Sequence, residues 1–155
     1  MGALLIDILN EQIKSSNVSL IIINKSYSQD LLKKIDNRID IHFINRPKKS
    51  RNPLYVFKLN RLLFKLKTDV IHCHNVKAIG LLLNNFKRMS VITAHDTNIK
   101  SNYFKSYKIA FAISKAVQKD LENRYNIKSA LNYNGINLES VQKKVKIEKK
   151  KSYKF

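Results

Sequence analysis

The chain alternates between two hydrophobic patterns from its first residues onward. Across residues 2–15, apolar side chains recur every three or four positions with polar ones between them, which predicts an amphipathic helix. Residues 18–23 (VSLIII) follow as a compact apolar run rich in β-branched residues. A run of this kind, without polar alternation, is typical of a strand buried on both faces of a parallel sheet.

The same two patterns continue to residue 133 and predict the rest of the fold. We expect further helices at 28–35, 53–66, 76–86 and 115–125, and further strands at 39–44, 69–73, 90–94, 107–113 and 130–133. Strands that alternate with helices form βαβ units. A chain of 155 residues fits one domain. We therefore predict an α/β fold with a Rossmann-like, doubly wound parallel sheet.

Residues that could bind a ligand or take part in catalysis lie where the predicted strands end. Residues 69–75 (DVIHCHN) place two histidines around the only cysteine, and residues 93–97 (TAHDT) add a third histidine and a carboxylate. Ser114 follows another strand. Ligands of doubly wound sheets bind beyond the carboxyl ends of the strands, so we expect these residues to face one cleft.

The residue types in the first stretch raise the question of a metal site. On a strand, His72 and His74 share a face while Cys73 points away, so the cysteine is a poor co-ligand. The spacing does not match a structural zinc site, although His72, His74, His95 and Asp96 could still form an open one. We expect no metal and no other cofactor, with His72 packed at a strand end and Cys73 buried as a small apolar residue.

The chain also carries a large excess of positive charge. The chain has 30 Lys and Arg against 11 Asp and Glu, a net charge of +19, which favours polyanionic partners. An AT-rich coding sequence would also enrich Lys, Asn and Ile without selection for binding. The single cysteine, the lack of an export-signal pattern and the shortness of every apolar run predict a cytoplasmic protein without a membrane span.

Four motifs in order resemble a known family. They are DVIHCHN (69–75), VITAHDT (91–97), AISKAV (112–117) and NYNGIN (132–137). On this βαβ pattern the chain resembles the N-terminal, acceptor-binding domain of family 4 glycosyltransferases, which are retaining enzymes of the GT-B fold. The resemblance covers about residues 2–140, and residues 141–155 are interpreted as a basic linker or tail.

The resemblance also implies what a complete enzyme would add. Members of the family begin with a strand and a glycine-rich turn, whereas Gly2 stands where that turn would be. Their second Rossmann-like domain, which carries the nucleotide-sugar site, would follow the end of this chain. We therefore expect a truncated or split glycosyltransferase with an unfilled place in its sheet, inactive alone, which meets a nucleotide-sugar donor only if a C-terminal domain is supplied.

The resemblance assigns roles to the residues at the strand ends. His95 is the catalytic candidate, lining the cleft near the transferred sugar, because imidazole can donate to a hydroxyl or phosphate oxygen. Asp96 could orient His95, accept an acceptor hydroxyl or cap the following loop. Ser114 is expected to cap the next helix, with some chance of ligand contact. The acceptor-binding set is Asp96, Thr97, His74, Asn75 and Ser114, and the interdomain hinge is Asn134 and Gly135.

Between Asp40 and Asp69 the chain has no acidic residue. A basic loop there leads into a basic amphipathic helix, which is either an ordinary surface helix with a solvated Lys face or a contact for anionic lipid. The lipid interpretation would suit lipid-linked acceptors at the inner face of the cell membrane. Its candidate residues are Lys48, Lys49, Arg51, Lys58, Arg61 and Lys65.

Three functions compete. The first is an acceptor-binding domain for sugar transfer to lipid- or polysaccharide-linked acceptors in cell-envelope glycan synthesis. The second is a basic nucleic-acid-binding α/β module, although no recognisable nucleic-acid motif is present, so no specific nucleic acid is expected as a partner. The third is a non-functional gene remnant.

Overall fold

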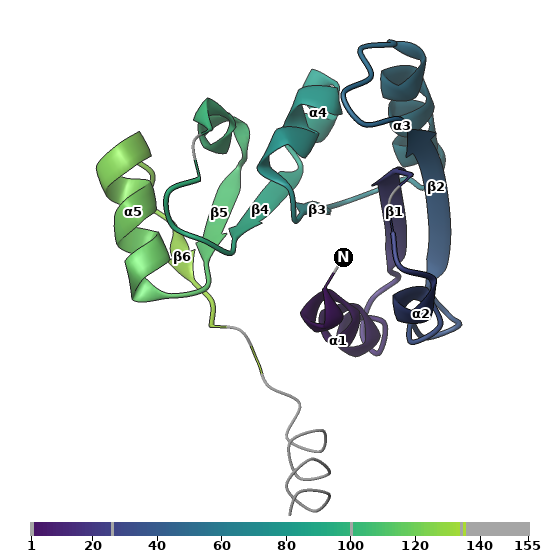
Figure 1. The fold of residues 1–155 in the computed structure, drawn as a ribbon, viewed down its shortest axis with the longest axis horizontal. Coiled ribbons are helices and arrows are strands. Elements are labelled where there is room, and N and C mark those ends of the chain that lie inside the picture. Colours follow the sequence, from purple (N-terminus) through teal and green to yellow (C-terminus); the bar gives the residue numbers. More distant parts are fainter. Residues whose placement is uncertain (1, 26, 100, 134, 136–155) are drawn as a thin grey trace, which may run out of the picture.

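The computed structural model describes residues 2–25, 27–99, 101–133 and 135. Helices and strands alternate along the described chain, with two short 3₁₀ helices, η1 and η2, among them (Figure 1). In order they are α1 (Ala3–Gln12), β1 (Ser19–Asn24), α2 (Gln29–Leu32), β2 (Asp40–Arg46), α3 (Leu54–Lys65), β3 (Ile71–Cys73), η1 (Val76–Leu81), α4 (Asn84–Lys87), β4 (Ser90–Ala94), η2 (Asn102–Ser106), β5 (Ile109–Ala112), α5 (Lys115–Tyr125) and β6 (Ala130–Leu131).

All the strand pairs are parallel, which confirms the predicted Rossmann-like α/β class. β1 pairs with β2, and a four-stranded sheet has the order β3-β4-β5-β6. The register aligns Cys73 of β3 with Ile92 of β4, and Ala94 of β4 with Ala112 of β5. The ends of β3, β4 and β5 therefore lie next to one another along one edge.

The strands form two sheets, however, and not one continuous sheet. In Figure 1, β1 and β2 lie on one side of the molecule and β3 to β6 on the other. Among the described residues, no strand pairs with β1 on its second edge or joins it to β3. In a doubly wound sheet the first strand lies between the second and the fourth. In this structure the division lies between β1 and β3.

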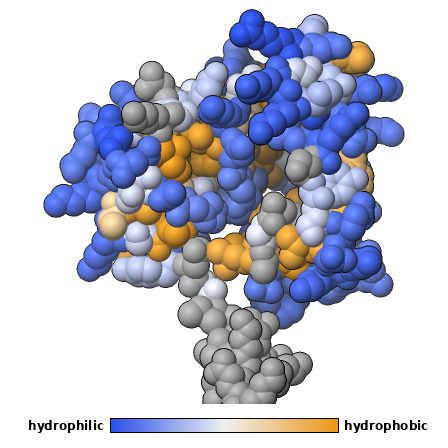
Figure 2. Space-filling model, viewed as in Figure 1, coloured by the Kyte–Doolittle hydropathy of each residue, from blue (hydrophilic) through white to orange (hydrophobic). Residues whose placement is uncertain are grey.

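One hydrophobic core nevertheless connects the two sheets. Leu59 and Leu63 on the inner face of α3 belong to the same buried cluster as Ile44 of β2 and Ile92 of β4. Ile6 and Leu9 of α1 and Ile39, just before β2, are also buried but do not belong to this core. Figure 2 shows hydrophobic residues gathered toward the middle of the viewed face, with hydrophilic residues around its edge.

A buried asparagine joins α3 to the segment between η1 and α4. Asn60 is 5% exposed, and its Nδ2 donates to the carbonyl oxygens of Val56 (2.7 Å) and Leu81 (2.8 Å). Its Oδ1 accepts from the backbone N–H of Leu83 at 2.8 Å. The bond to Val56 lies within α3, whereas the bonds to Leu81 and Leu83 join α3 to another segment and so determine which face of the helix points inward.

Several predicted elements differ in detail. The helix predicted over 76–86 is instead η1 followed by α4, because Leu82 and Leu83 adopt extended backbone angles and Leu83 bonds to Asn60. η2 was not predicted, and the strand predicted from 107 begins only at Ile109. The helix predicted over 28–35 is a single turn. α5 has its predicted bounds and ends at Asn126, whose positive φ of 54° is common for asparagine at a helix C-terminus.

The sequence predicted that no segment spans a membrane, and the length and apolarity of the described helices can be set against this prediction. None of these is long and apolar enough to cross a bilayer.

Candidate functional site

A row of three imidazole rings follows the carboxyl ends of β3 and β4. The rings of His72 and His74 stack with centroids 4.5 Å apart, and those of His74 and His95 with centroids 5.6 Å apart. His72 and His74 come from β3 and the residue after it, and His95 directly follows β4. Because these strands are parallel neighbours, the row results from the strand register.

The first ring of the row is tied to the sheet. Nε2 of His72 lies 2.7 Å from Oγ1 of Thr93, a hydrogen bond between neighbouring strands. Cys73 points the other way into the core and is 7% exposed. The predicted division of β3 into a histidine face and a cysteine face is confirmed. His72 has its hydrogen-bond partner, but it is exposed rather than packed inside.

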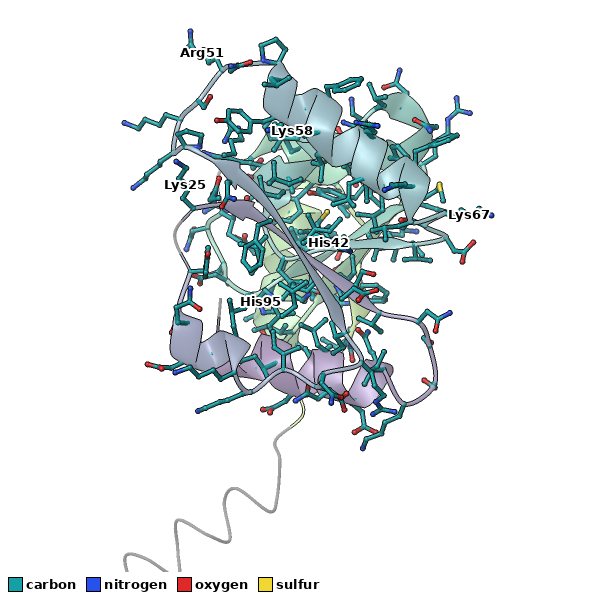
Figure 3. The ribbon with its side chains drawn as sticks, turned by 90° about the vertical axis from the view of Figure 1, so that its right-hand side faces the viewer. Lys25, His42, Arg51, Lys58, Lys67 and His95 are labelled. Atoms are coloured by element: carbon teal, nitrogen blue, oxygen red, sulfur yellow. The ribbon has the colours of Figure 1, made fainter. Side chains whose placement is uncertain are left out.

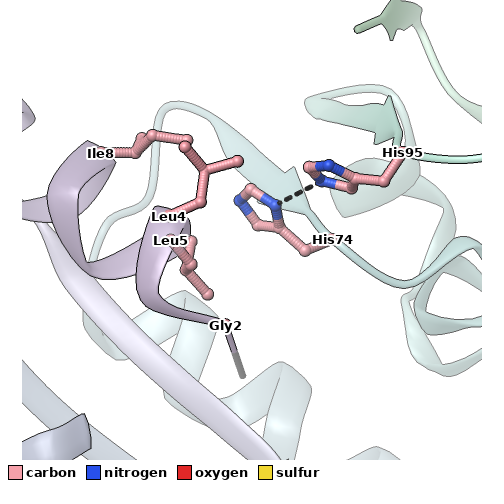
Figure 4. Close-up of a pocket in the computed structure, with 6 residues that line it drawn as sticks. All are labelled: Gly2, Leu4, Leu5, Ile8, His74 and His95. Carbon is pink, nitrogen blue, oxygen red and sulfur yellow. Dashed lines mark hydrogen bonds between the residues drawn. The ribbon is translucent and has the colours of Figure 1, made fainter. Parts of the chain in front are cut away.

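The other two rings form the polar wall of a pocket. Nδ1 of His74 lies 3.3 Å from Nε2 of His95, close enough for a weak hydrogen bond. Figure 4 shows this pair facing Leu4, Leu5 and Ile8 of α1 across the pocket. Together with Gly2 these residues line a volume of about 300 Å³, the lower end of the range for small-molecule sites. The pocket has one polar wall and one hydrocarbon wall.

Burial keeps His74 neutral. Loss of solvent, with a smaller contribution from the neighbouring His72 and His95, lowers the pKa of His74 to about 4. The pKa of His72 is also lowered, chiefly by partial loss of solvent around its ring, although the residue as a whole remains exposed. Neutral imidazole has one N–H donor and one acceptor nitrogen. At neutral pH the His74 ring therefore brings hydrogen-bonding capacity to the pocket without a positive charge.

A buried tyrosine supports the segment that carries His74. The Oη of Tyr107 lies 2.9 Å from the carbonyl oxygen of Val76 and 3.2 Å from that of Asn75, and it accepts from the N–H of Ile79 at 3.2 Å. Burial raises the pKa of the Tyr107 hydroxyl, and burial also raises that of the Cys73 thiol beside it. Both groups therefore remain protonated at neutral pH.

The loop after β4 holds Asp96 and Thr97. Oδ1 of Asp96 accepts from the N–H of Thr97 at 2.8 Å, so the carboxylate caps its own loop. Asn98 continues the loop with a positive φ, and its N–H donates to Oδ2 of Asp120 on α5 at 3.0 Å. Of the three roles open to Asp96, the loop cap is the one the structure shows.

Two further predicted site residues are helix caps. Oγ of Ser114 accepts from the N–H of Val117 at 3.2 Å, which confirms the predicted cap of α5. Oδ1 of Asn75 accepts from the N–H of Lys77 at 2.9 Å and caps η1. Neither residue is among those that line the pocket. Of the predicted acceptor-binding set, the pocket contains His74, which lies there with the catalytic candidate His95.

The remaining predicted residues lie elsewhere. The six basic residues predicted for membrane contact are exposed on α3 and the loop before it. Of the hinge pair, Asn134 falls outside the described residues, and a side chain added at Gly135 would meet nothing within 4 Å. Within the described ranges, no group of three or more His, Cys, Asp or Glu side chains is arranged to hold a metal ion.

Sequence reasoning missed one wall of the pocket and its supports. Leu4, Leu5 and Ile8 had the spacing of core-facing helix residues, and the pattern did not distinguish a core contact from a pocket wall. Thr93 stood in the VITAHDT motif but had no assigned role. Its place two residues before His95 put it on the same face of β4, which was the available signal.

The fold defines a Rossmann-like α/β protein, with a pocket lined in part by residues that follow β3 and β4 of the parallel sheet. The model of Glycosyltransferase Family 4 matches residues 6–140, so the chain belongs to this family. No curated protein and no solved structure gives a significant match to the chain.

Proposed function

We propose that this chain provides the acceptor-binding domain of a glycosyltransferase that moves a sugar from a nucleotide-sugar to a lipid- or polysaccharide-linked acceptor in cell-envelope glycan synthesis. The observation that carries the proposal is the pocket between α1 and the His74–His95 pair. It lies beyond the ends of β3 and β4, where doubly wound sheets bind their ligands. Sugar transfer takes place in the cytoplasm at the inner face of the membrane.

The two walls of the pocket suit an amphiphilic acceptor. Leu4, Leu5 and Ile8 offer hydrocarbon contact to the apolar part, and the imidazoles offer hydrogen bonds to a hydroxyl. Because the pKa of His74 is lowered to about 4, its ring brings no positive charge to this wall at neutral pH. A neutral hydroxyl fits it better than a free anion does.

His95 is the residue that contacts the reacting groups. One of its ring nitrogens, Nε2, faces His74, and within the described residues the other ring nitrogen has no hydrogen-bond partner. That free nitrogen can donate to, or accept from, an acceptor hydroxyl. His74 then acts as a positioning residue because its contact with Nε2 fixes the orientation of the His95 ring.

Calorimetric binding of octyl glucoside and of free glucose tests the proposed site. We expect octyl glucoside, below its micelle concentration, to bind more tightly than glucose because only the former contacts the leucine wall. His95→Asn should weaken binding about tenfold, the loss of one hydrogen bond of about 1.4 kcal/mol. His42→Asn is the matched control, since His42 lies on β2 and is not among the pocket residues.

Two results would contradict the proposal. One is equal binding of octyl glucoside by the native chain and His95→Asn. The other is tighter binding of glucose than of octyl glucoside.

A further inference from the structure

The outer face of α3 combines exposed apolar side chains with exposed cations. At 3.6 residues per turn, positions 54, 57, 61 and 64 fall on one side of a helix. The exposed fractions are 51% for Leu54, 63% for Phe57 and 78% for Phe64. Leu59 and Leu63, on the opposite side, are each 3% exposed. Leu54, Phe57 and Phe64 are called the apolar face of α3 below.

This apolar face cannot turn inward. Asn60 makes three hydrogen bonds on the inner side of the helix, and Leu59 and Leu63 belong to the main core. Rotating Phe57 or Phe64 toward the sheet would break the Asn60 bonds to Leu81 and Leu83 and remove both leucines from the core. Single exposed apolar residues are ordinary on protein surfaces, but a fixed cluster on one helix face marks an interaction surface.

Cations surround the apolar face. Figure 3 shows Arg51 and Lys58 projecting from the loop before α3 and from α3 itself. None of the ion pairs between described residues uses a residue of α3 or of that loop. Lys58 instead stands over the ring of Tyr55, 5.9 Å from its centroid. The exposed cations of this surface are Lys48, Lys49, Arg51, Lys58, Arg61 and Lys65.

We infer that α3 lies in the surface of an anionic lipid bilayer, with Phe57 and Phe64 inserted at the level of the headgroups and the six cations on the lipid phosphates. Apolar side chains beside cations on one helix face are the physical requirement for such binding. Charge complementarity identifies the partner, since this stretch carries no acidic residue to repel phosphate. The inference goes beyond acceptor binding and does not depend on sugar transfer.

Insertion distinguishes this partner from other polyanions. A lipid surface offers hydrocarbon just below its phosphates, so the aromatic residues gain burial as the cations gain partners. Double-stranded nucleic acid offers phosphate without hydrocarbon at that depth. An experiment that follows the environment of Phe57 therefore separates the two.

The chain contains no tryptophan, so one introduced residue serves as a clean probe. Phe57→Trp should shift its emission to shorter wavelength when phosphatidylglycerol-containing vesicles are added, and should not shift with pure phosphatidylcholine vesicles. Tyr133→Trp is the control, because Tyr133 is 61% exposed and lies far from α3 in sequence. A shift of the Phe57→Trp emission with duplex DNA or RNA but not with vesicles would overturn the inference.

Sedimentation of the full chain with the same vesicles tests the apolar face. Phe57→Ala with Phe64→Ala should weaken binding about tenfold, because partition scales with the apolar area buried. Leu83→Ala with Tyr133→Ala removes two side chains of similar exposure elsewhere, 55% and 61%, and should leave binding unchanged. Equal loss in both double variants would contradict insertion.

Two triple variants that remove the same positive charge test the cations of α3. Their comparison separates the position of the charges from the net charge of the chain. Lys58→Gln, Arg61→Gln and Lys65→Gln together should abolish most vesicle binding at about 0.1 M salt, where the Debye length is about 10 Å. Lys105→Gln, Lys108→Gln and Lys119→Gln remove the same charge from other exposed positions and should retain it. If both triple variants lose binding equally, net charge alone explains the attraction and the α3 surface is not the contact.

Discussion

The strands β1 and β4 have similar apolar content but different surroundings. β4 is hydrogen-bonded on both sides, by β3 and β5, and Ile92 and Ala94 are each 1% exposed. β1 is paired only with β2, and its residues 20–23 are all half-buried although they are an unbroken aliphatic run. Burial of a parallel strand therefore depends on neighbours at both edges and not on its own hydrophobicity.

One isoleucine-to-alanine substitution in each strand gives the largest expected difference in stability between β4 and β1. Ile92→Ala should lower the free energy of unfolding by about 3 kcal/mol, because it removes three side-chain carbons from a filled core. Ile22→Ala in β1 should cost about 1 kcal/mol, because Ile22 is only half-buried. Urea unfolding of both variants measures the difference. Equal losses would show that β1 is as well packed as β4.

The second prediction concerns the connection between the two regions. Asn60→Ala should lower the free energy of unfolding by about 2 kcal/mol, because it leaves Leu81 and Leu83 with unpaired backbone groups. Asn123→Ala, at an exposed position of α5, is the control and should change stability little. Thermal and urea unfolding would provide the measurement. A neutral Asn60→Ala variant would mean that water replaces these bonds.

The smallest expected effect is a pH response on the β3–β4 side. The native pKa of His74 is lowered to about 4, against an ordinary value of 6.5, so the unfolded chain takes up a proton first as pH falls. Stability should therefore be complete above about pH 6.5 and decline toward pH 4. Because solvent still reaches part of the ring, the decline should be on the order of 1 kcal/mol, below the full value of the pKa shift. His74→Gln should flatten this decline in urea unfolding. An NMR titration of His74 with a midpoint near 6.5 would contradict it.

Much of the fold followed from the sequence because local patterns determine local elements. The helix at 115–125, its Ser114 cap and the strand at 90–94 were predicted with their observed bounds. The helix at 76–86 was not, because its interruption arises from a bond between Leu83 and Asn60, which are 23 positions apart. Contacts of this range leave no periodic signal.

The arrangement of the candidate site could also be predicted in part from the sequence. Strand ends and β periodicity placed His72, His74 and His95 together and turned Cys73 away. The same reasoning could not show that Asn75 and Ser114 would cap helices outside the pocket lining, because a cap and a ligand contact use the same residue types. It also could not assign the faces of α3. Leucines and phenylalanines alternate there, and only the packing shows that Leu59 and Leu63 lie inside while Phe57 and Phe64 lie outside.

The pocket lies between α1 and the second sheet. Leu4, Leu5 and Ile8 of α1 line one side, and His74 and His95, which follow strands of the second sheet, line the other. A molecule bound there acts as a reversible crosslink between them. Its stabilisation grows as RT ln(1 + [L]/Kd), about 2.7 kcal/mol at a hundredfold excess over Kd. The melting temperature of the chain thus reports occupancy directly, and libraries of amphiphilic glycans can be ranked by thermal shift without any donor or turnover.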